Sequence, residues 1–243
     1  MKQQTKNVDI FKLKKETKSP RLINKNGKAQ IKEKFWQKNA GLDKNEGPWM
    51  NRLLVATPST GLVRMEWVLS RYGMTIPTNF SMVNIIQWMS AYAPVQHQLA
   101  DAENLIAKAC VEGNYQWLVQ IEEDNVLPLD FFTRMNEYII KGDVPIVSGL
   151  YFTKSNPPEP MTYRGRGTGS FQDFKLGDKV WCDGMPFGAC LIHGSIIRAL
   201  WNESEEYTVN GIVTRRVFDN RPKAFGKPED GKFATTSGTT DLA

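Results

Sequence analysis

Short apolar runs separated by polar turns predict a succession of buried strands and amphipathic helices along most of the chain. The clearest strands are Arg52–Thr57 and Trp117–Ile121, in which apolar side chains predominate. Three segments place apolar residues at helical spacing, and these are residues 62–72, 101–112 and 129–140. We therefore expect an α/β fold, and the chain of 243 residues is long enough for one sizeable domain of this class.

The remaining pattern adds shorter elements. Residues 78–91 form a helical or mixed apolar segment that Pro94 ends, and a helix is expected to begin near Ser195, capped by Gly194–Ser195. The pair Asn210–Gly211 is typical of a hairpin turn. Strands or strand pairs are accordingly expected at residues 95–99, 143–149, 189–193 and 207–218.

Three carboxylates, Glu122, Glu123 and Asp124, follow directly after the strand Trp117–Ile121. Ligands of open α/β sheets bind beyond the carboxyl ends of the strands, so these acids are candidates for a binding site. Because side chains alternate along a strand, we expect Glu122 and Asp124 to point the same way and Glu123 the other way. Two like charges in one crevice favour a cation between them. Hard oxygen ligands suit Mg²⁺ or Mn²⁺, and such ions usually also hold substrate phosphates.

The order of these features resembles GT-A-fold glycosyltransferases of the family-2-like kind. In that family an apolar strand ending in Asp/Glu-x-Asp holds a divalent metal against the diphosphate of a nucleotide-sugar, and Glu122–Asp124 is similar to that motif. Two further segments resemble the family, namely Pro145–Phe152 on the acceptor side and Gly188–Ile192 under the acceptor site. Thr240–Leu242 matches the start of the segment that carries the general base. The helix that follows it in the family is missing here, so we expect the C-terminal part of the domain to be incomplete.

The resemblance implies a three-layer α/β/α sandwich with a mainly parallel central sheet, and a catalytic domain over residues 46–243. It implies a hexosyltransferase that moves a sugar from a nucleotide-diphosphate donor to a hydroxyl of a glycan or other acceptor, with Mn²⁺ or Mg²⁺ as cofactor. Asp124 is then expected to bind the metal directly, and Glu122 to bind it through water or to hold the ribose. Asp241 is the expected general base, and Asp183 is a second candidate for that role.

Residues expected to bind the nucleotide-sugar come from several segments, and they are Thr57, Pro58, Asn104, Glu122, Glu123, Arg164 and Arg166. Thr57 and Pro58 begin the segment 57–61, which stands where the first loop of the family contacts the base. Asn104 matches the second residue of an Arg-Asn pair, whose arginine is replaced here by Glu103. The two arginines lie in a loop rich in glycine and proline, and guanidinium groups suit phosphate oxygens.

Charge is distributed unevenly along the chain. Residues 1–40 contain twelve Lys/Arg and three Asp/Glu, a local charge of +9 within a total of +5, so the remainder carries −4. Residues 1–45 are therefore expected to be a basic extension, suited at most to weak contact with an anionic surface. It has too few aromatic residues to predict specific nucleic-acid binding. With no apolar N-terminal region, no run of about 18 apolar residues and three cysteines, the sequence predicts a cytoplasmic protein.

Two other function classes fit the same residues. Acids at strand ends also occur in other α/β enzymes that use nucleotides and metals, such as nucleotidyltransferases. A non-catalytic module that kept the GT-A-like fold for binding would also retain this pattern. Selective binding and transfer of a nucleotide-sugar separates the glycosyltransferase from both alternatives.

Overall fold

The computed structural model describes residues 49–78, 82–153, 155–164 and 170–219. Outside these ranges it also places four short strands, which form two antiparallel pairs. They are β1 (Leu22–Ile23) with β2 (Ala29–Gln30), and β9 (Lys223–Phe225) with β10 (Ala234–Thr236). Apart from β1 and β2, the basic segment 1–45 lies outside the described residues.

A sheet of four strands forms the centre of the protein, in the order β3 (Asn51–Ala56), β4 (Tyr115–Ile121), β6 (Ala189–His193) and β5 (Ile146–Ser148). Strands β3 and β4 pair in parallel, whereas β6 is antiparallel to both of its neighbours. The expected α/β class is confirmed, but the sheet is mixed rather than mainly parallel. The physical reason lies in residues 149–188. They join β5 to β6, and the described residues of this connection (149–153, 155–164 and 170–188) include no crossover helix of the kind that usually returns the chain to a parallel neighbour.

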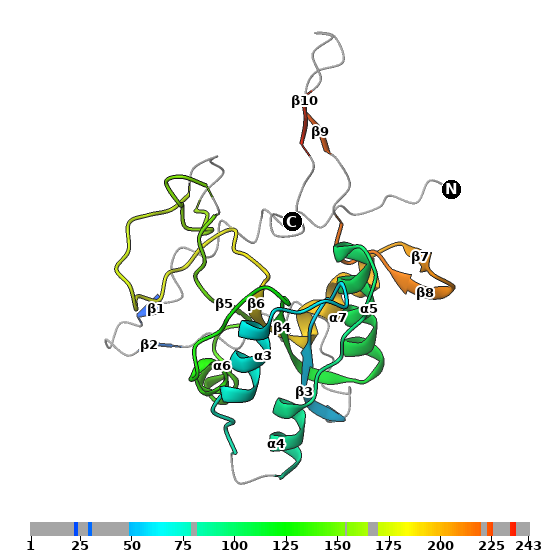
Figure 1. Cartoon of the computed structure of the whole chain (residues 1–243), viewed down its shortest axis with the longest axis horizontal. Coiled ribbons are helices and arrows are strands. Elements are labelled where there is room, and N and C mark those ends of the chain that lie inside the picture. Colours follow the sequence, from blue (N-terminus) through cyan, green and yellow to red (C-terminus); the bar gives the residue numbers. More distant parts are fainter. Residues whose placement is uncertain are drawn as a thin grey trace.

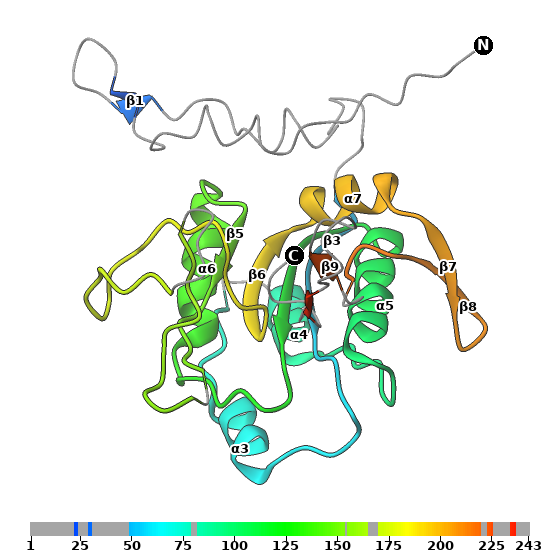
Figure 2. The same cartoon turned by 90° about the horizontal axis from the view of Figure 1, so that it is seen from above.

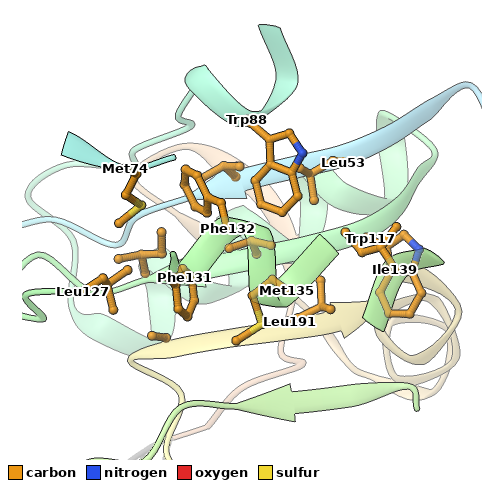
Figure 3. Packing of buried hydrophobic residues seen from close by; sticks show 14 residues of the cluster. Leu53, Met74, Trp88, Trp117, Leu127, Phe131, Phe132, Met135, Ile139 and Leu191 are labelled. Carbon is orange, nitrogen blue, oxygen red and sulfur yellow. The ribbon is translucent and has the colours of Figure 1, made fainter. Parts of the chain in front are cut away.

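One face of the sheet carries a core built around α6 (Phe131–Lys141), with the side chain of Trp88 from α4 (Met82–Met89) packed into it. Figure 3 shows Trp88 beside Phe132 and Leu53, above the strands. From the strand β4, Trp117, Val119 and Ile121 join this core, as the alternation of side chains along a strand requires.

The opposite face of the sheet is covered by α5 (Leu99–Glu112) and α7 (Gly194–Glu203). Leu118 of β4 packs there against Ile106 and Cys110 of α5 and Ile197 of α7. Figures 1 and 2 show α5 and α7 together on one side of the sheet and α6 on the other, while α3 (Met65–Gly73) lies beyond the end of β4. The sheet is therefore buried on both faces.

Several smaller elements differ from the sequence expectation. No strand forms at residues 95–99, because Tyr92 and Val95 make only isolated bridges to Ala56 and Ser59 and the helix α5 already begins at Leu99. The cap of α7 is also different from the expected Gly-Ser cap, because the His193 side chain accepts a hydrogen bond from the Ser195 amide. The expected hairpin is confirmed. It consists of β7 (Glu206–Val209) and β8 (Ile212–Arg215), with positive φ at both turn residues between them.

Within the described part of the chain, we find no helix with the length and apolar character that crossing a membrane requires.

Candidate functional site

The first component of the candidate site is a contact between the loop after β3 and the acids after β4. The Glu123 carboxylate accepts hydrogen bonds from the Ser59 hydroxyl at 2.5 Å and the Thr60 hydroxyl at 2.6 Å, and from the Thr60 amide at 3.0 Å. Because β3 and β4 are parallel neighbours, their carboxyl ends meet at one edge of the sheet. The loop after β3 and the acids after β4 therefore lie side by side.

The hydrogen bonds change the acidity of Glu123. Partial burial by itself raises the pKa of a carboxyl, but the bonds from Ser59 and Thr60 outweigh that effect, so the pKa of Glu123 lies below its usual value. Glu123 is therefore a fixed carboxylate whose two oxygens are both used inside the protein.

Glu122 and Asp124 form the second component. Both carboxylates lie within hydrogen-bonding distance of the Asn125 side-chain nitrogen, at 3.3 Å from Glu122 and 3.4 Å from Asp124. These two acids thus share one side while Glu123 points toward the loop after β3, which matches the expected arrangement. The reason differs from the one expected, because β4 ends at Ile121 and a turn, not the alternation of a strand, places the three side chains.

Gly188 contacts this turn through its backbone. Its carbonyl accepts hydrogen bonds from the Glu122 amide at 2.7 Å and from the Asn125 side chain at 3.2 Å. A Cβ atom at Gly188 would come within 2.3 Å of Asn125 Nδ2 and 2.7 Å of Glu122 Oε2. Only glycine allows the two side chains to lie where they do.

Two aromatic residues near the acids make hydrogen bonds to the backbone. Trp67 of α3 donates a 2.9 Å hydrogen bond from its indole nitrogen to the Glu122 carbonyl, which joins α3 to the turn. The Tyr151 hydroxyl accepts a hydrogen bond from the Ala189 amide at the start of β6. Burial above all, together with the nearby Cys190 and Glu122, raises the pKa of Tyr151, so its hydroxyl keeps its proton at neutral pH.

The expected base-contacting residues Thr57 and Pro58 are both buried. The Thr57 amide donates to the Tyr92 carbonyl at 2.9 Å, and the buried Thr57 hydroxyl has no hydrogen-bond partner within the described part of the chain. The exposed part of this loop begins further along, at Thr60 and Gly61. A ligand at this edge would therefore meet the loop after Pro58.

Asn104 lies fully buried on α5 and connects that helix to the segment after β8. Its side-chain nitrogen donates to the Tyr207 hydroxyl and the Phe218 carbonyl, and its side-chain oxygen accepts from the amides of Val217 and Phe218. All of these distances are 2.8 to 2.9 Å. The side-chain amide of Asn104 is thus hydrogen-bonded to other groups of the protein.

Arg164 and Asp183 lie together on the long connection between β5 and β6, and both are exposed. Arg164 donates to the Trp181 carbonyl at 3.0 Å and its guanidinium lies 4.3 Å from the centre of the Phe171 ring. The Asp183 amide donates to the Tyr163 carbonyl at 2.8 Å. Arg166 and Asp241, together with the rest of Thr240–Leu242, lie outside the described residues.

Among the residues that the structure describes, no group of protein side chains could bind a metal ion by itself. No three acidic, histidine or cysteine side chains converge there in a way that could hold an ion. Glu122 and Asp124 can supply two carboxylates, while the oxygens of Glu123 are engaged by Ser59 and Thr60. A cation at this site would need its other ligands from water and from a bound substrate, which is the usual manner of Mg²⁺.

Sequence reasoning did not assign Trp67 and Asn125 to the site, and it included Ser59 and Thr60 only as part of the loop 57–61. The position of Ser59 and Thr60 directly after a strand could have indicated a site role, because polar side chains after the carboxyl ends of parallel strands lie close together. The position of Asn125 directly after the acids could likewise have indicated a site role. Nothing in the sequence indicates that the tryptophan of α3 reaches the turn.

Comparison with known proteins adds little to this description. No family model and no curated protein matches the chain. Among solved structures, similarity is found to the crystal structure of A197 from STIV, with 18% sequence identity and a TM-score of 0.42. The matched region covers 60% of this chain and 66% of that chain, just under two thirds of its length. Neither the fold nor the function is argued from this similarity.

Proposed function

We propose that this chain is a metal-dependent glycosyltransferase with a GT-A-type three-layer α/β/α domain. It moves a sugar from a nucleotide-diphosphate donor to the hydroxyl of a glycan or another acceptor. The observation that supports this proposal is the contact of Ser59 and Thr60 with Glu123, the middle acid of the run after β4, at the carboxyl ends of two parallel strands. The three cysteines, an odd number with no disulfide framework, are the reason for placing the reaction in the cytoplasm.

Donor binding is assigned to the edge of the sheet between the loop after β3 and the turn after β4. Glu123 holds that loop in place through Ser59 and Thr60, so the loop is organised before a ligand arrives. Such preorganisation lowers the entropy cost of binding. Arg164 is the exposed cation that we assign to the diphosphate, because a guanidinium group matches phosphate oxygens.

A divalent cation would be held by Asp124 and Glu122, whose carboxylates share the Asn125 amide. When bound, Mn²⁺ or Mg²⁺ neutralises the charge that gathers on a leaving diphosphate. Two carboxylates alone are a weak site, so we expect metal binding to depend on the donor, whose phosphates add the missing oxygen ligands. Asn125 and Gly188 keep the two acids in position for that role.

An inverting transfer needs a carboxylate that removes the proton of the acceptor hydroxyl. Among the described residues, Asp183 is the candidate on the connection that precedes β6, and it is exposed to solvent. Asp241 is the other candidate, from the resemblance described above.

A second function, a non-catalytic module with the same fold, is favoured by one observation. The described residues hold no group of three metal-binding side chains, and the catalytic alternatives all require a metal. Such a module would bind a nucleotide-sugar without transferring its sugar.

Thermal unfolding of the purified chain tests donor binding. The sample is heated with UDP-, GDP-, ADP- and CDP-sugars, each with and without Mn²⁺. We expect one nucleotide class to raise the midpoint temperature only when the metal is also present. Asp124→Ala should abolish this shift. Asp143→Ala, an exposed aspartate before β5 and therefore at the other end of the sheet, should preserve it.

The outcomes separate the proposals. A metal-dependent shift followed by transfer of the labelled sugar to an acceptor supports the glycosyltransferase. A shift without transfer favours the binding module. No shift with any pair, in a folded sample, contradicts a donor site at this edge of the sheet.

A further inference from the structure

The helix α4 lies in an unusually uncharged part of the chain. Residues 74–100 contain no Lys, Arg, Asp or Glu, although about a quarter of the whole chain is charged. The nearest charged residues on either side are Arg71 and Asp101. Any surface that this segment presents must therefore be recognised without ion pairs.

One side of α4 packs against the core of the domain. Trp88 is 2% exposed and packs against Phe132, with ring centres 4.6 Å apart, as Figure 3 shows. Ile85, three residues before Trp88, is half-buried on the same side. Trp88 attaches the helix to the core on the α6 face of the sheet.

The other side of α4 carries apolar side chains that are exposed among the residues the structure describes. Met82, Val83, Ile86 and Met89 are 61% to 70% exposed, and their spacing places them on one continuous face of the helix. In Figure 1, α4 lies at the edge of the domain, away from the centre of the sheet. We call this face of four residues the α4 face. Exposed apolar patches rimmed by polar residues mark interaction sites, so the α4 face needs a partner.

We propose that the α4 face binds the α4 face of a second copy of this chain, giving a two-fold symmetric dimer. A two-fold axis places the same surface on both partners, so any charge at its centre meets its own like charge. The absence of charge through residues 74–100 removes that repulsion. Homodimer interfaces are also more apolar than other interfaces and enriched in methionine, and two of the four residues are Met82 and Met89.

Other occupants fit these residues less well. A helix that lies on a membrane surface carries Lys or Arg on its polar face, and α4 has none. A partner protein of opposite charge would find no charged residue to recognise within residues 74–100. Self-association is the occupant that this uncharged apolar surface favours.

Solution mass measures the proposal directly. Sedimentation velocity of the full chain, at concentrations from about 1 to about 100 µM, should give twice the monomer mass of 27.6 kDa at the upper end. Ile86→Lys should halve that mass, because two lysines would be buried against each other across the axis. A circular dichroism spectrum and an unfolding midpoint like those of the wild type would show that the variant is folded.

Ile140→Lys is the matched control, because Ile140 is also a helical isoleucine, is 65% exposed and lies on α6. It should leave the dimer intact. A wild-type chain that stays monomeric, or a dimer that survives Ile86→Lys, would overturn the proposal. Flotation of a monomeric wild type with phosphatidylcholine vesicles, lost in Ile86→Lys, would overturn it in favour of a lipid surface.

Discussion

The hydroxyl of Ser59 donates a 2.5 Å hydrogen bond to the carboxylate of Glu123, across 64 positions of sequence. The bond exists because β3 and β4 are parallel neighbours, and it connects the loop that follows one strand to the acids that follow the other. The shape of the candidate site therefore depends on an acid that is itself unavailable to a metal. Glu123 organises the site through Ser59 and Thr60, while Glu122 and Asp124 lie on the side of the Asn125 amide.

Removal of this carboxylate should loosen the loop. Glu123→Ala deletes an acceptor of three hydrogen bonds, and we expect the free energy of unfolding to fall by about 1 kcal/mol, since the group is partly exposed to water. Hydrogen exchange at the amides of Thr60 and Gly61 should become faster. Urea unfolding and exchange measured by mass spectrometry check both effects. Glu137→Ala on the exposed side of α6 is the control, and an equal effect there would argue against a specific role for Glu123.

The same contact predicts a pH dependence of stability. The pKa of Glu123 is lower in the folded chain than its ordinary value of 4.5, so folding favours the charged form. Its stabilisation is complete above that ordinary value and is lost as the pH falls through the lowered pKa of the folded state. The difference in unfolding free energy between wild type and Glu123→Ala should therefore shrink in acid. Urea titrations at a series of pH values measure it, and a difference that grows in acid would show the opposite sign.

Gly188 should not tolerate a side chain. Gly188→Ala places a methyl group 2.3 Å from Asn125 Nδ2 and 2.7 Å from Glu122 Oε2, so both side chains must move. We expect a loss of about 1 to 3 kcal/mol in stability and loss of the donor-dependent thermal shift. Gly149→Ala is the matched control, because its methyl group would lie at ordinary contact distances of 3.6 and 3.7 Å. Equal behaviour of the two variants would contradict the close approach at Gly188.

Asn104 should affect stability. Asn104→Ala removes the side-chain partner of the buried Phe218 amide and carbonyl and of the half-buried Val217 amide, and we expect a loss of about 2 to 4 kcal/mol. Asn202→Ala, on the exposed end of α7, should change stability by less than about 0.5 kcal/mol. Thermal unfolding compares the two. A fully stable Asn104→Ala variant that fails only to bind the nucleotide-sugar would instead assign Asn104 to the donor site.

The local pattern of the chain was enough to predict the α/β class, the strand that ends at Ile121 and the acids that follow it. These features depend on apolar runs and on residues adjacent in sequence, so periodicity and turn chemistry determine them. The hairpin around Asn210–Gly211 was predictable for the same reason, because its two turn residues adopt the positive φ that asparagine and glycine accept most readily.

The direction and order of the strands were decided only by the tertiary structure. Strand β6 enters between β4 and β5 in the antiparallel sense, and no local pattern in Ala189–His193 specifies its neighbours. The assignment of each acid was decided in the same way. Glu122, Glu123 and Asp124 are adjacent and all carry a carboxylate, yet only Glu123 accepts hydrogen bonds from Ser59 and Thr60. Those hydroxyls belong to the loop after the neighbouring strand β3. The sequence by itself thus determined which chemical groups are present at the end of β4. Packing between distant segments decided which of them meets the loop after β3 and which lie beside Asn125.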